Sequence, residues 1–235
     1  MTMEWTWDLD EAGVVRLAEL LALKVRRGDV ITLSGDLGAG KTTLARALIG
    51  AVVRDGSAEV SSPTFSLHQS YASPRLTIAH FDFYRLSNAD EAAELGFEDA
   101  ARDGAVIVEW PERAAGLLPE ARIEVVLAET RDVNVRRVTL RGLGGAGDRV
   151  ARLAGVVAFL DRQVDWSEAR ITYLQGDAST RSYARLSHDG RTALLMDAPR
   201  QPDGPPIRDG LPYSRIAHLA EDVRPFSAIA RVLKD

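Results

Sequence analysis

The sequence has no cysteine among its 235 residues, so it can form neither a disulfide framework nor a metal site with thiolate ligands. It also lacks any run of about 18 or more apolar residues, the length that a membrane-spanning helix needs. The N-terminus, MTMEWTWDLDEAG, does not have the basic and then apolar pattern of a secretion signal. We therefore predict a cytoplasmic protein without a membrane association.

Lysine is scarce as well. It occurs only at Lys24, Lys41 and Lys234, and arginine supplies the rest of the positive charge. The formal net charge is -5. This acidic balance gives no sign of a protein that holds nucleic acid mainly through its phosphates. We expect no DNA binding, and contact with RNA only through a partner protein.

The length of the chain allows two domains, and a glycine cluster marks the point where they would join. The composition, with 46% hydrophobic and 27% charged residues, is that of an ordinary globular protein. The run GLGGAG at 142–147 is the strongest linker signal. We predict a first domain over 1–141, a linker over 142–149 and a second domain over 150–235.

Helix-like and strand-like patterns alternate along the first domain. Apolar residues at helical spacing predict a first helix over about 10–27. Short apolar runs predict strands at 30–33, 76–82 and 105–109. Alternation of this kind is typical of an α/β fold with a largely parallel sheet.

Two more features refine that fold. A helix is predicted over 88–95, with Ser87 or Asn88 as its cap. Two further β runs, 122–129 and 133–141, are joined by a short turn, which favours an antiparallel edge. The predicted fold class is a three-layer α/β sandwich with a mostly parallel sheet and antiparallel edge strands.

A glycine-rich segment follows the first predicted strand and opens a helix. The phosphate-binding pattern G-x-x-x-x-G-K-[ST] is matched by Gly35, Asp36, Leu37, Gly38, Ala39, Gly40, Lys41 and Thr42. Backbone N–H groups of such a loop point at phosphate, as does the positive end of the following helix dipole. We expect Lys41 to neutralise the β- and γ-phosphates and the Thr42 hydroxyl to bind Mg²⁺. The pattern predicts a P-loop NTPase.

Enzymes that hydrolyse a triphosphate also need a carboxylate near the metal and a group that orients the attacking water. Asp82 and Glu109 close two predicted strands, and parallel strands would bring both to the same edge as the glycine-rich loop. Both stay candidates for the two roles. His80 stands alone on its strand and is expected to be an ordinary structural histidine.

Five segments stand in order along the first domain: GDLGAGKTTL, SSPTF (61–65), HFDFYRL (80–86), ELGFED (94–99) and VEWPER (108–113). Together they resemble the TsaE family of bacterial tRNA threonylcarbamoyladenosine synthesis. GKTT is common to P-loop proteins, whereas HFDFYRL and VEWPER in this order are specific to that family. The resemblance spans roughly residues 10–141.

The resemblance implies an ATP and Mg²⁺ site formed by Lys41, Thr42, Thr43, Glu109 and Trp110. In that site Glu109 assists the metal and Trp110 lies close to the nucleotide. Asp82 belongs to the segment associated with hydrolysis. Residues 62–64 fall in a mobile, switch-like loop.

The resemblance also implies partners. Members of the family are ATPases that work with TsaD and TsaB, the proteins that form threonylcarbamoyladenosine next to the anticodon. The ATPase does not transfer the carbamoyl group itself. We expect weak ATP hydrolysis by the chain alone and a switch in which the γ-phosphate orders nearby loops. Contact with tRNA is expected only through the complex.

The residues after the glycine cluster resemble the start of an aminoglycoside-phosphotransferase-like kinase, of the kind that phosphorylates N-acetylmuramate or N-acetylglucosamine. The segments are LQGDASTRSYARL, ALLMDAP and RPFSAIARVL, and the resemblance implies a partial α+β N-lobe with a nucleotide-covering loop at 176–179. The ALLMD strand has no lysine, and the catalytic loop of such a kinase would lie beyond residue 235. We expect a truncated natural fusion without kinase activity in this chain.

Other functions stay open on the sequence. The main alternative is an amino-sugar kinase with a regulatory P-loop domain, and a second is a small-molecule P-loop kinase, for which only scattered arginines speak. A GTPase would need an Asn-Lys-x-Asp motif, which is absent. Four arginines of the last predicted strands could contact tRNA or an acidic partner, but exposed arginines are more often simply solvated, which is what we expect here. They are Arg131, Arg136, Arg137 and Arg141.

Overall fold

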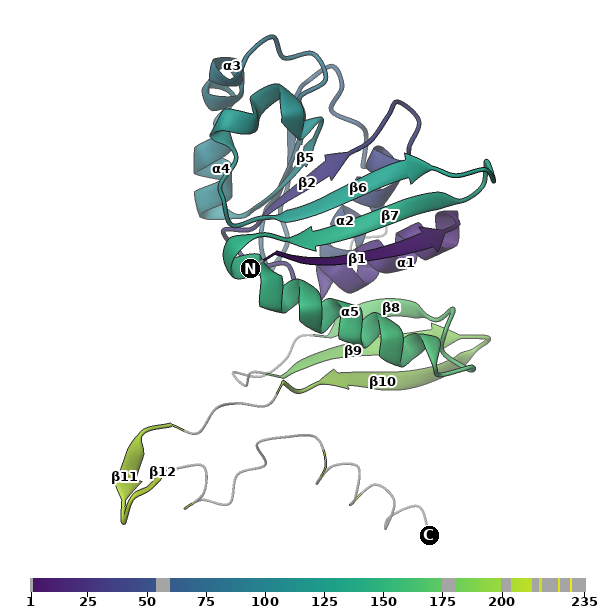
Figure 1. The fold of residues 1–235 in the computed structure, drawn as a ribbon, viewed down its shortest axis with the longest axis vertical. Coiled ribbons are helices and arrows are strands. Elements are labelled where there is room, and N and C mark those ends of the chain that lie inside the picture. The colour runs from purple at the N-terminus through teal and green to yellow at the C-terminus, as the bar shows by residue number, and fades with distance from the viewer. Residues whose placement is uncertain are drawn as a thin grey trace. The chain divides into compact units, whose positions relative to one another are not determined.

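A computed structural model of the chain describes residues 2–53, 60–174, 181–199 and 204–212, with the single residues 216, 224 and 229. Its largest element is a seven-stranded sheet in the order β1-β7-β6-β2-β5-β4-β3 (Figure 1). The strands are β1 (Met3–Leu9), β2 (Val30–Ser34), β3 (His68–Tyr71), β4 (Ile78–Asp82), β5 (Ala105–Glu109), β6 (Ile123–Glu129) and β7 (Arg136–Gly142).

The middle of this sheet is parallel and its two edges are antiparallel. β2 pairs in parallel with β5 and with β6, and β4 pairs in parallel with β5. β7 pairs antiparallel with β1 and with β6, and β3 pairs antiparallel with β4. The predicted mostly parallel sheet with antiparallel edge strands is confirmed.

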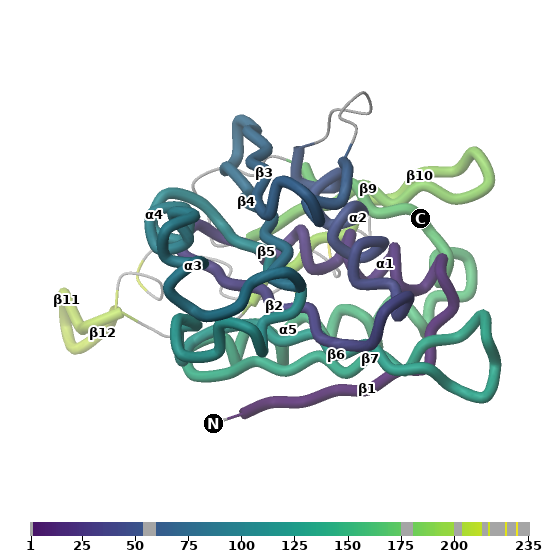
Figure 2. Tube along the Cα trace, turned by 90° about the horizontal axis from the view of Figure 1, so that it is seen from above, coloured from purple at the N-terminus to yellow at the C-terminus, as the bar shows by residue number. Residues whose placement is uncertain are grey.

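Helices connect these strands. They are α1 (Glu11–Ala22), α2 (Lys41–Val53), α3 (Ala89–Glu94), α4 (Phe97–Asp103), α5 (Gly147–Asp161) and the 3-10 segments η1 (Pro111–Leu117) and η2 (Gly144–Ala146). α1 and α2 pack against each other (Figure 2). Asn88 caps α3 as predicted, because its side-chain oxygen accepts a hydrogen bond from the Glu91 N–H at 3.1 Å.

The first helix is shorter than the sequence predicts. It ends at Ala22 rather than near 27. The guanidinium of Arg75, from a distant loop, donates hydrogen bonds to the carbonyls of Ala22 and Val25. These bonds satisfy acceptors at the helix end that would otherwise need another turn of helix or water.

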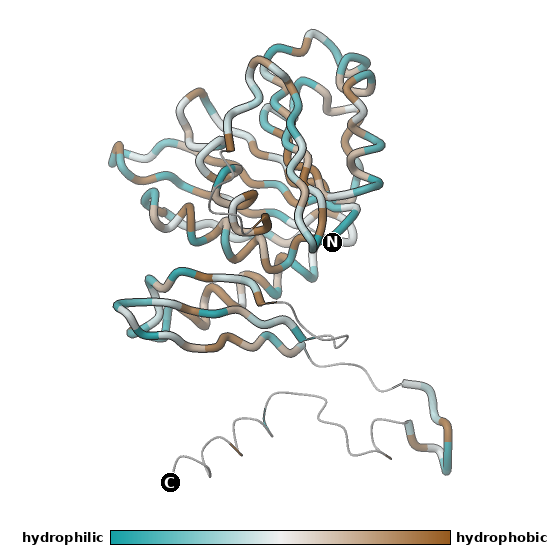
Figure 3. The backbone as a smooth tube through the Cα atoms, turned by 180° about the vertical axis from the view of Figure 1, so that it is seen from behind, coloured by the Kyte–Doolittle hydropathy of each residue, from teal (hydrophilic) through white to brown (hydrophobic). Residues whose placement is uncertain are grey.

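The two faces of the sheet have different roles. Hydrophobic residues run along its strands (Figure 3). Alternate side chains of β4 and β5 enter a core beneath α3, α4 and η1, whose members include Ala79, Phe81, Phe83, Phe97, Val106 and Val108. The residues between them point to the opposite face, where Thr42 of α2 bonds to Glu109. This second face carries His80, Asp82 and Glu109.

β1 is an element that the sequence prediction did not contain. It pairs with β7 along its whole length, from Met3 opposite Gly142 to Leu9 opposite Arg136. Its apolar residues at odd positions are half-buried and its polar residues at even positions are exposed. The alternation that identifies an edge strand was therefore present in MEWTWDL.

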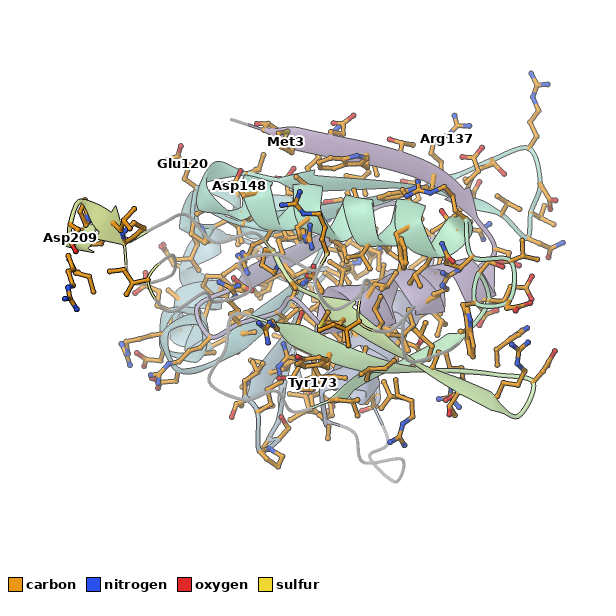
Figure 4. The ribbon with its side chains drawn as sticks, turned by 90° about the horizontal axis from the view of Figure 1, so that it is seen from below. Met3, Glu120, Arg137, Asp148, Tyr173 and Asp209 are labelled. Carbon is orange, nitrogen blue, oxygen red and sulfur yellow. The ribbon has the colours of Figure 1, made fainter. Side chains whose placement is uncertain are left out.

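α5 packs against β1, β7 and α1. It runs beside β1 in the same direction, with Asp148 and Met3 near their N-terminal ends (Figures 1 and 4). In its first turn, Arg149 donates one hydrogen bond to each carboxylate oxygen of Asp29, both at 2.6 Å. The predicted linker segment 142–149 is occupied by the end of β7, η2 and the start of α5. The division into domains over 1–141 and 150–235 stays a prediction.

The later residues form smaller sheets. β8 (Arg170–Leu174), β9 (Ser182–His188) and β10 (Arg191–Asp197) lie in the order β10-β9-β8, and β11 (Pro206–Arg208) pairs with β12 (Leu211–Pro212). By its contacts the chain divides into two units, Met1–Tyr173 with Arg185–Ala193, and Leu174–Ala184 with Leu194–Asp235. The predicted loop over 176–179 lies outside the described residues. Among the described helices, none has both the length and the apolarity to cross a bilayer.

We expect Arg149→Ala to lower the free energy of unfolding by on the order of 2 kcal/mol, because among the described residues a buried Asp29 would keep only its bond from the Arg26 N–H. Arg102→Ala is the matched control, since it removes an exposed ion pair with Asp99 and should cost less than about 0.5 kcal/mol. Urea denaturation of the full chain measures both. Equal, small losses would show that the pair does not hold α5 in place.

Candidate functional site

The glycine-rich loop turns sharply between β2 and α2. Gly35, Gly38 and Gly40 have φ angles of 143°, 80° and 99°, in the region that side chains with a Cβ disfavour. At Gly35 there is also no room, because a Cβ there would lie 2.3 Å from the Leu127 carbonyl oxygen. These glycines let the backbone fold close around a phosphate-sized space at the start of α2.

Lys41 is held inside this loop. Its ammonium donates hydrogen bonds to the carbonyls of Gly35 at 2.7 Å and Asp36 at 2.8 Å, and lies 3.8 Å from the centre of the Trp110 ring. Burial lowers the pKa of Lys41, and the negative charge of Glu109 opposes that shift. The loop thus keeps its single ammonium group at the position where an anion would bind.

Glu109 ends β5 and is 2% exposed. Its Oε2 accepts a hydrogen bond from the Thr42 hydroxyl at 3.0 Å, and its Oε1 lies 3.0 Å from Nε2 of His80. The carboxylate therefore connects the first turn of α2 with the middle of β4. Oε2 is thus paired with Thr42 and Oε1 with His80.

Asp82 stands next to Glu109 across the β4–β5 pairing and is 3% exposed. Its Oδ2 accepts a hydrogen bond from the Thr64 hydroxyl at 2.9 Å, and its Oδ1 accepts one from the Tyr84 N–H at 3.0 Å. The Thr64 hydroxyl lies 2.8 Å from that of Ser62. Asp82 thereby connects the segment 62–64 to the tip of β4.

These groups line one cavity of about 280 Å³. Of the residues that the sequence proposed for the site, it brings together Leu37, Gly38, Gly40, Lys41, Thr42, Thr43, Asp82, Glu109 and Trp110, and it adds Thr64 and Tyr84. Gly35 and Asp36 do not line it, although their carbonyls hold Lys41. Ala39 is buried and lines a neighbouring cavity of about 430 Å³ instead.

Trp110 follows Glu109 and closes one side of the cavity. Its backbone has a φ angle of 59°, which is unusual for a bulky residue. The residue begins the turn into η1, and its ring packs on Tyr84 with the ring centres 5.0 Å apart. The turn places an aromatic face beside the ammonium of Lys41.

The sequence of this domain matches a known family. The family model described as "Threonylcarbamoyl adenosine biosynthesis protein TsaE" matches residues 9–138. This range contains every residue that lines the cavity. The chain belongs to the TsaE family. This family takes part in threonylcarbamoyladenosine biosynthesis and binds a nucleotide.

Several TsaE proteins named as tRNA threonylcarbamoyladenosine biosynthesis proteins are similar to this chain. The protein from Rickettsia felis is 41% identical over 127 residues, which cover 54% of this chain and 73% of the relative. The protein from Streptomyces coelicolor is 40% identical over 136 residues, 55% of this chain and 87% of the relative. The crystal structure of YdiB from Bacillus subtilis matches with a TM-score of 0.56 at 26% identity, over 66% of this chain and 97% of YdiB.

His80 has a position in this TsaE-type site that its sequence context alone does not indicate. A lone histidine on a strand predicts an ordinary structural role, yet His80 contacts Glu109. A signal existed, because His80 precedes Asp82 by two residues on one strand and must point to the same face. What the sequence did not show was which residue of the next strand it would meet.

We expect Gly35→Ala to destabilise the protein by on the order of 2 kcal/mol, since the new Cβ would overlap the Leu127 carbonyl and the φ angle would be strained. Gly50→Ala is the matched control, because its Cβ meets nothing within 4 Å and alanine favours the helix by about 0.5 to 1 kcal/mol. Thermal unfolding of the full chain measures both. A Gly35→Ala protein as stable as the wild type would contradict the close approach.

Proposed function

We propose that this TsaE-family protein binds and hydrolyses ATP with Mg²⁺ at the cavity between the glycine-rich loop and the tips of β4 and β5. The observation that carries the proposal is the meeting of Lys41, Thr42 and Glu109 at one end of the sheet. An ammonium, a hydroxyl and a carboxylate in this order are the groups that P-loop enzymes use for phosphate and metal.

The loop residues suit a triphosphate. Backbone N–H groups of residues 35–43 and the N-terminal end of α2 offer hydrogen bonds and positive potential to phosphate oxygens. Lys41 supplies the charge, and would exchange its present bonds to the loop carbonyls for bonds to phosphate. Trp110 and Thr43 line the same space and are proposed to lie against the nucleotide.

The oxygen atoms around this space suit Mg²⁺, which prefers hydroxyl, carboxylate and water ligands. Thr42 and Glu109 would hold the ion, directly or through water. Bound Mg²⁺ neutralises charge on the transferred phosphoryl group. Asp82 and Glu109 are the two candidates for orienting the attacking water, and the buried position of both, on neighbouring strands, supports either role.

We propose that this ATPase acts with TsaD and TsaB in forming threonylcarbamoyladenosine on tRNA, in the cytoplasm. Coupling to partners requires a segment that responds to the nucleotide. The hydrogen bond from Thr64 to Asp82 supports such a role for residues 62–64. If the contacts of Asp82 change with the bound nucleotide, this hydrogen bond would form or break, and the segment would be held or released with it.

Contact with tRNA is proposed to be indirect. Two of the strand arginines are already paired, Arg137 with Asp8 and Arg141 with Glu4. These pairs lie between β1 and β7 and neutralise charge that RNA would otherwise meet. The pairing therefore supports the prediction that these arginines are simply solvated and do not form a phosphate-binding surface.

The identity of the C-terminal region stays a proposal too. The family match ends at residue 138 and says nothing of the residues after it. The small sheet of β8, β9 and β10 is compatible with part of a kinase N-lobe. We propose this identity for the region, and we propose that it has no kinase activity in this chain.

Lys41→Ala is expected to raise the Kd for ATP at least about tenfold, because it removes the charge-assisted bonds to phosphate. Lys24→Ala is the matched control, since Lys24 does not line the cavity. Isothermal titration with ATP measures affinity, and co-purification with TsaD and TsaB, with and without ATP, measures complex formation. Unchanged ATP affinity of Lys41→Ala would refute the site, and a wild-type chain that never joins the two partners would refute the role.

Glu109→Ala is expected to abolish ATP turnover while some ATP binding remains, because the phosphate loop is intact but the metal loses a carboxylate. A phosphate-release assay beside ATP titration separates the two effects. Full turnover in Glu109→Ala would transfer the metal role to Asp82, for which Asp82→Asn is then the variant to measure.

A further inference from the structure

The site contains a buried histidine to which the proposed mechanism gives no task. His80 is fully buried in the middle of β4, and its Nε2 lies 3.0 Å from Oε1 of Glu109. Its other ring nitrogen, Nδ1, is buried and has no hydrogen-bond partner among the residues that the structure describes. Within the described part of the chain, the one hydrogen bond of this imidazole is thus directed at the carboxylate of Glu109.

The sheet geometry explains why these two side chains meet. Asp82 lies opposite Glu109 in the parallel pairing of β4 and β5, and His80 lies opposite Ile107. Side chains two residues apart on a strand share a face, so His80 stands diagonally next to Glu109. The contact is fixed by the register of two central strands rather than by a loop.

The hydrogen bond has a direction. A carboxylate is an acceptor, so Nε2 carries the hydrogen and donates to Oε1 of Glu109. The Nδ1 atom, which meets no acceptor in the parts of the chain that are described, needs no hydrogen in this tautomer. A buried histidine kept for packing alone would not need its donor aimed at Glu109, and an apolar residue would fill the space without leaving a nitrogen unpaired.

We propose that His80 is a positioning residue for Glu109. It fixes the plane of the carboxylate, so that Oε1 is occupied and Oε2 points to Thr42 and the metal site. The inference rests on the proposed ATP and Mg²⁺ site. In metal sites, a bond of this kind from an outer residue orients the ligand and tunes its strength.

Two properties of the site make such an orientation necessary. The terminal torsion of a glutamate has a broad, roughly two-fold preference, so the chain alone does not fix where each oxygen points. The Lys41 ammonium is close enough for its charge to interact with Glu109. Without His80, an unpaired Oε1 would be free to turn towards Lys41 and away from the metal site.

The test uses the full chain and a fluorescent ATP analogue, with its Kd measured once in EDTA and once in Mg²⁺. For the wild type we expect Mg²⁺ to tighten binding. His80→Leu should lose about tenfold of that gain, with the Kd in EDTA unchanged, because only the carboxylate is misplaced. His80→Gln should recover most of it, since its amide donates from about the same distance along the side chain. His80→Asn, whose amide is too short, should not.

His68 provides the matched control. It lies on β3, stacks on Phe81 with ring centres 4.4 Å apart, and bonds to Ser70 rather than to Glu109. His68→Leu should therefore keep the full gain from Mg²⁺. Thermal unfolding without nucleotide shows how far each variant is destabilised, and a structural role alone would not change the ratio of the two Kd values.

The outcomes distinguish the proposed ATP and Mg²⁺ site from the role of His80. A wild-type chain that does not bind the analogue, or that gains nothing from Mg²⁺, contradicts the proposed function itself. A wild-type gain that survives in His80→Leu, or in His80→Asn where His80→Leu does not fold, overturns the role of His80. Loss in both and recovery in His80→Gln supports it.

Discussion

The burial of a carboxylate at the end of β5 is the constraint on which this site depends. A buried negative charge is tolerated only where hydrogen-bond donors surround it. Glu109 meets Thr42 on one side and His80 on the other, so a helix start and a neighbouring strand are joined through one side chain. The parallel pairing of β2, β5 and β4 is what allows this, because it brings all three elements to one edge.

The phosphate loop obeys a second constraint, that of close approach. Gly35 has no space for a Cβ against the Leu127 carbonyl, so β6 as well as β2 shapes the loop. Lys41 fills the resulting space with its own ammonium, bonded to two loop carbonyls and covered by Trp110. The charge of the site is thus held within the loop by bonds that phosphate oxygens would replace.

Helix α5, which lies beyond the residues matched by the family model, packs against the elements of the first domain. The family match ends at residue 138, yet α5 packs on β1, β7 and α1, and Arg149 clamps Asp29 beside the start of β2. The glycine cluster contributes the end of β7, η2 and the start of α5. Here its residues form a tight turn, and Gly142 lies where a Cβ would be 2.8 Å from the Ala146 carbonyl oxygen.

Local patterns in the sequence determined the strand AVIVE, the β6–β7 hairpin, the capped helix after Asn88 and the phosphate loop, because each depends on neighbouring residues alone. The strand MEWTWDL has the same kind of local signal, an alternation of apolar and polar residues. Only the tertiary structure decided that Arg75 ends α1, that Arg149 meets Asp29 and that His80 meets Glu109. These pairs are separated by many residues. Strand register brings His80 to Glu109, and the packing of helices and loops against the sheet brings the other two pairs together, and no local pattern specifies either.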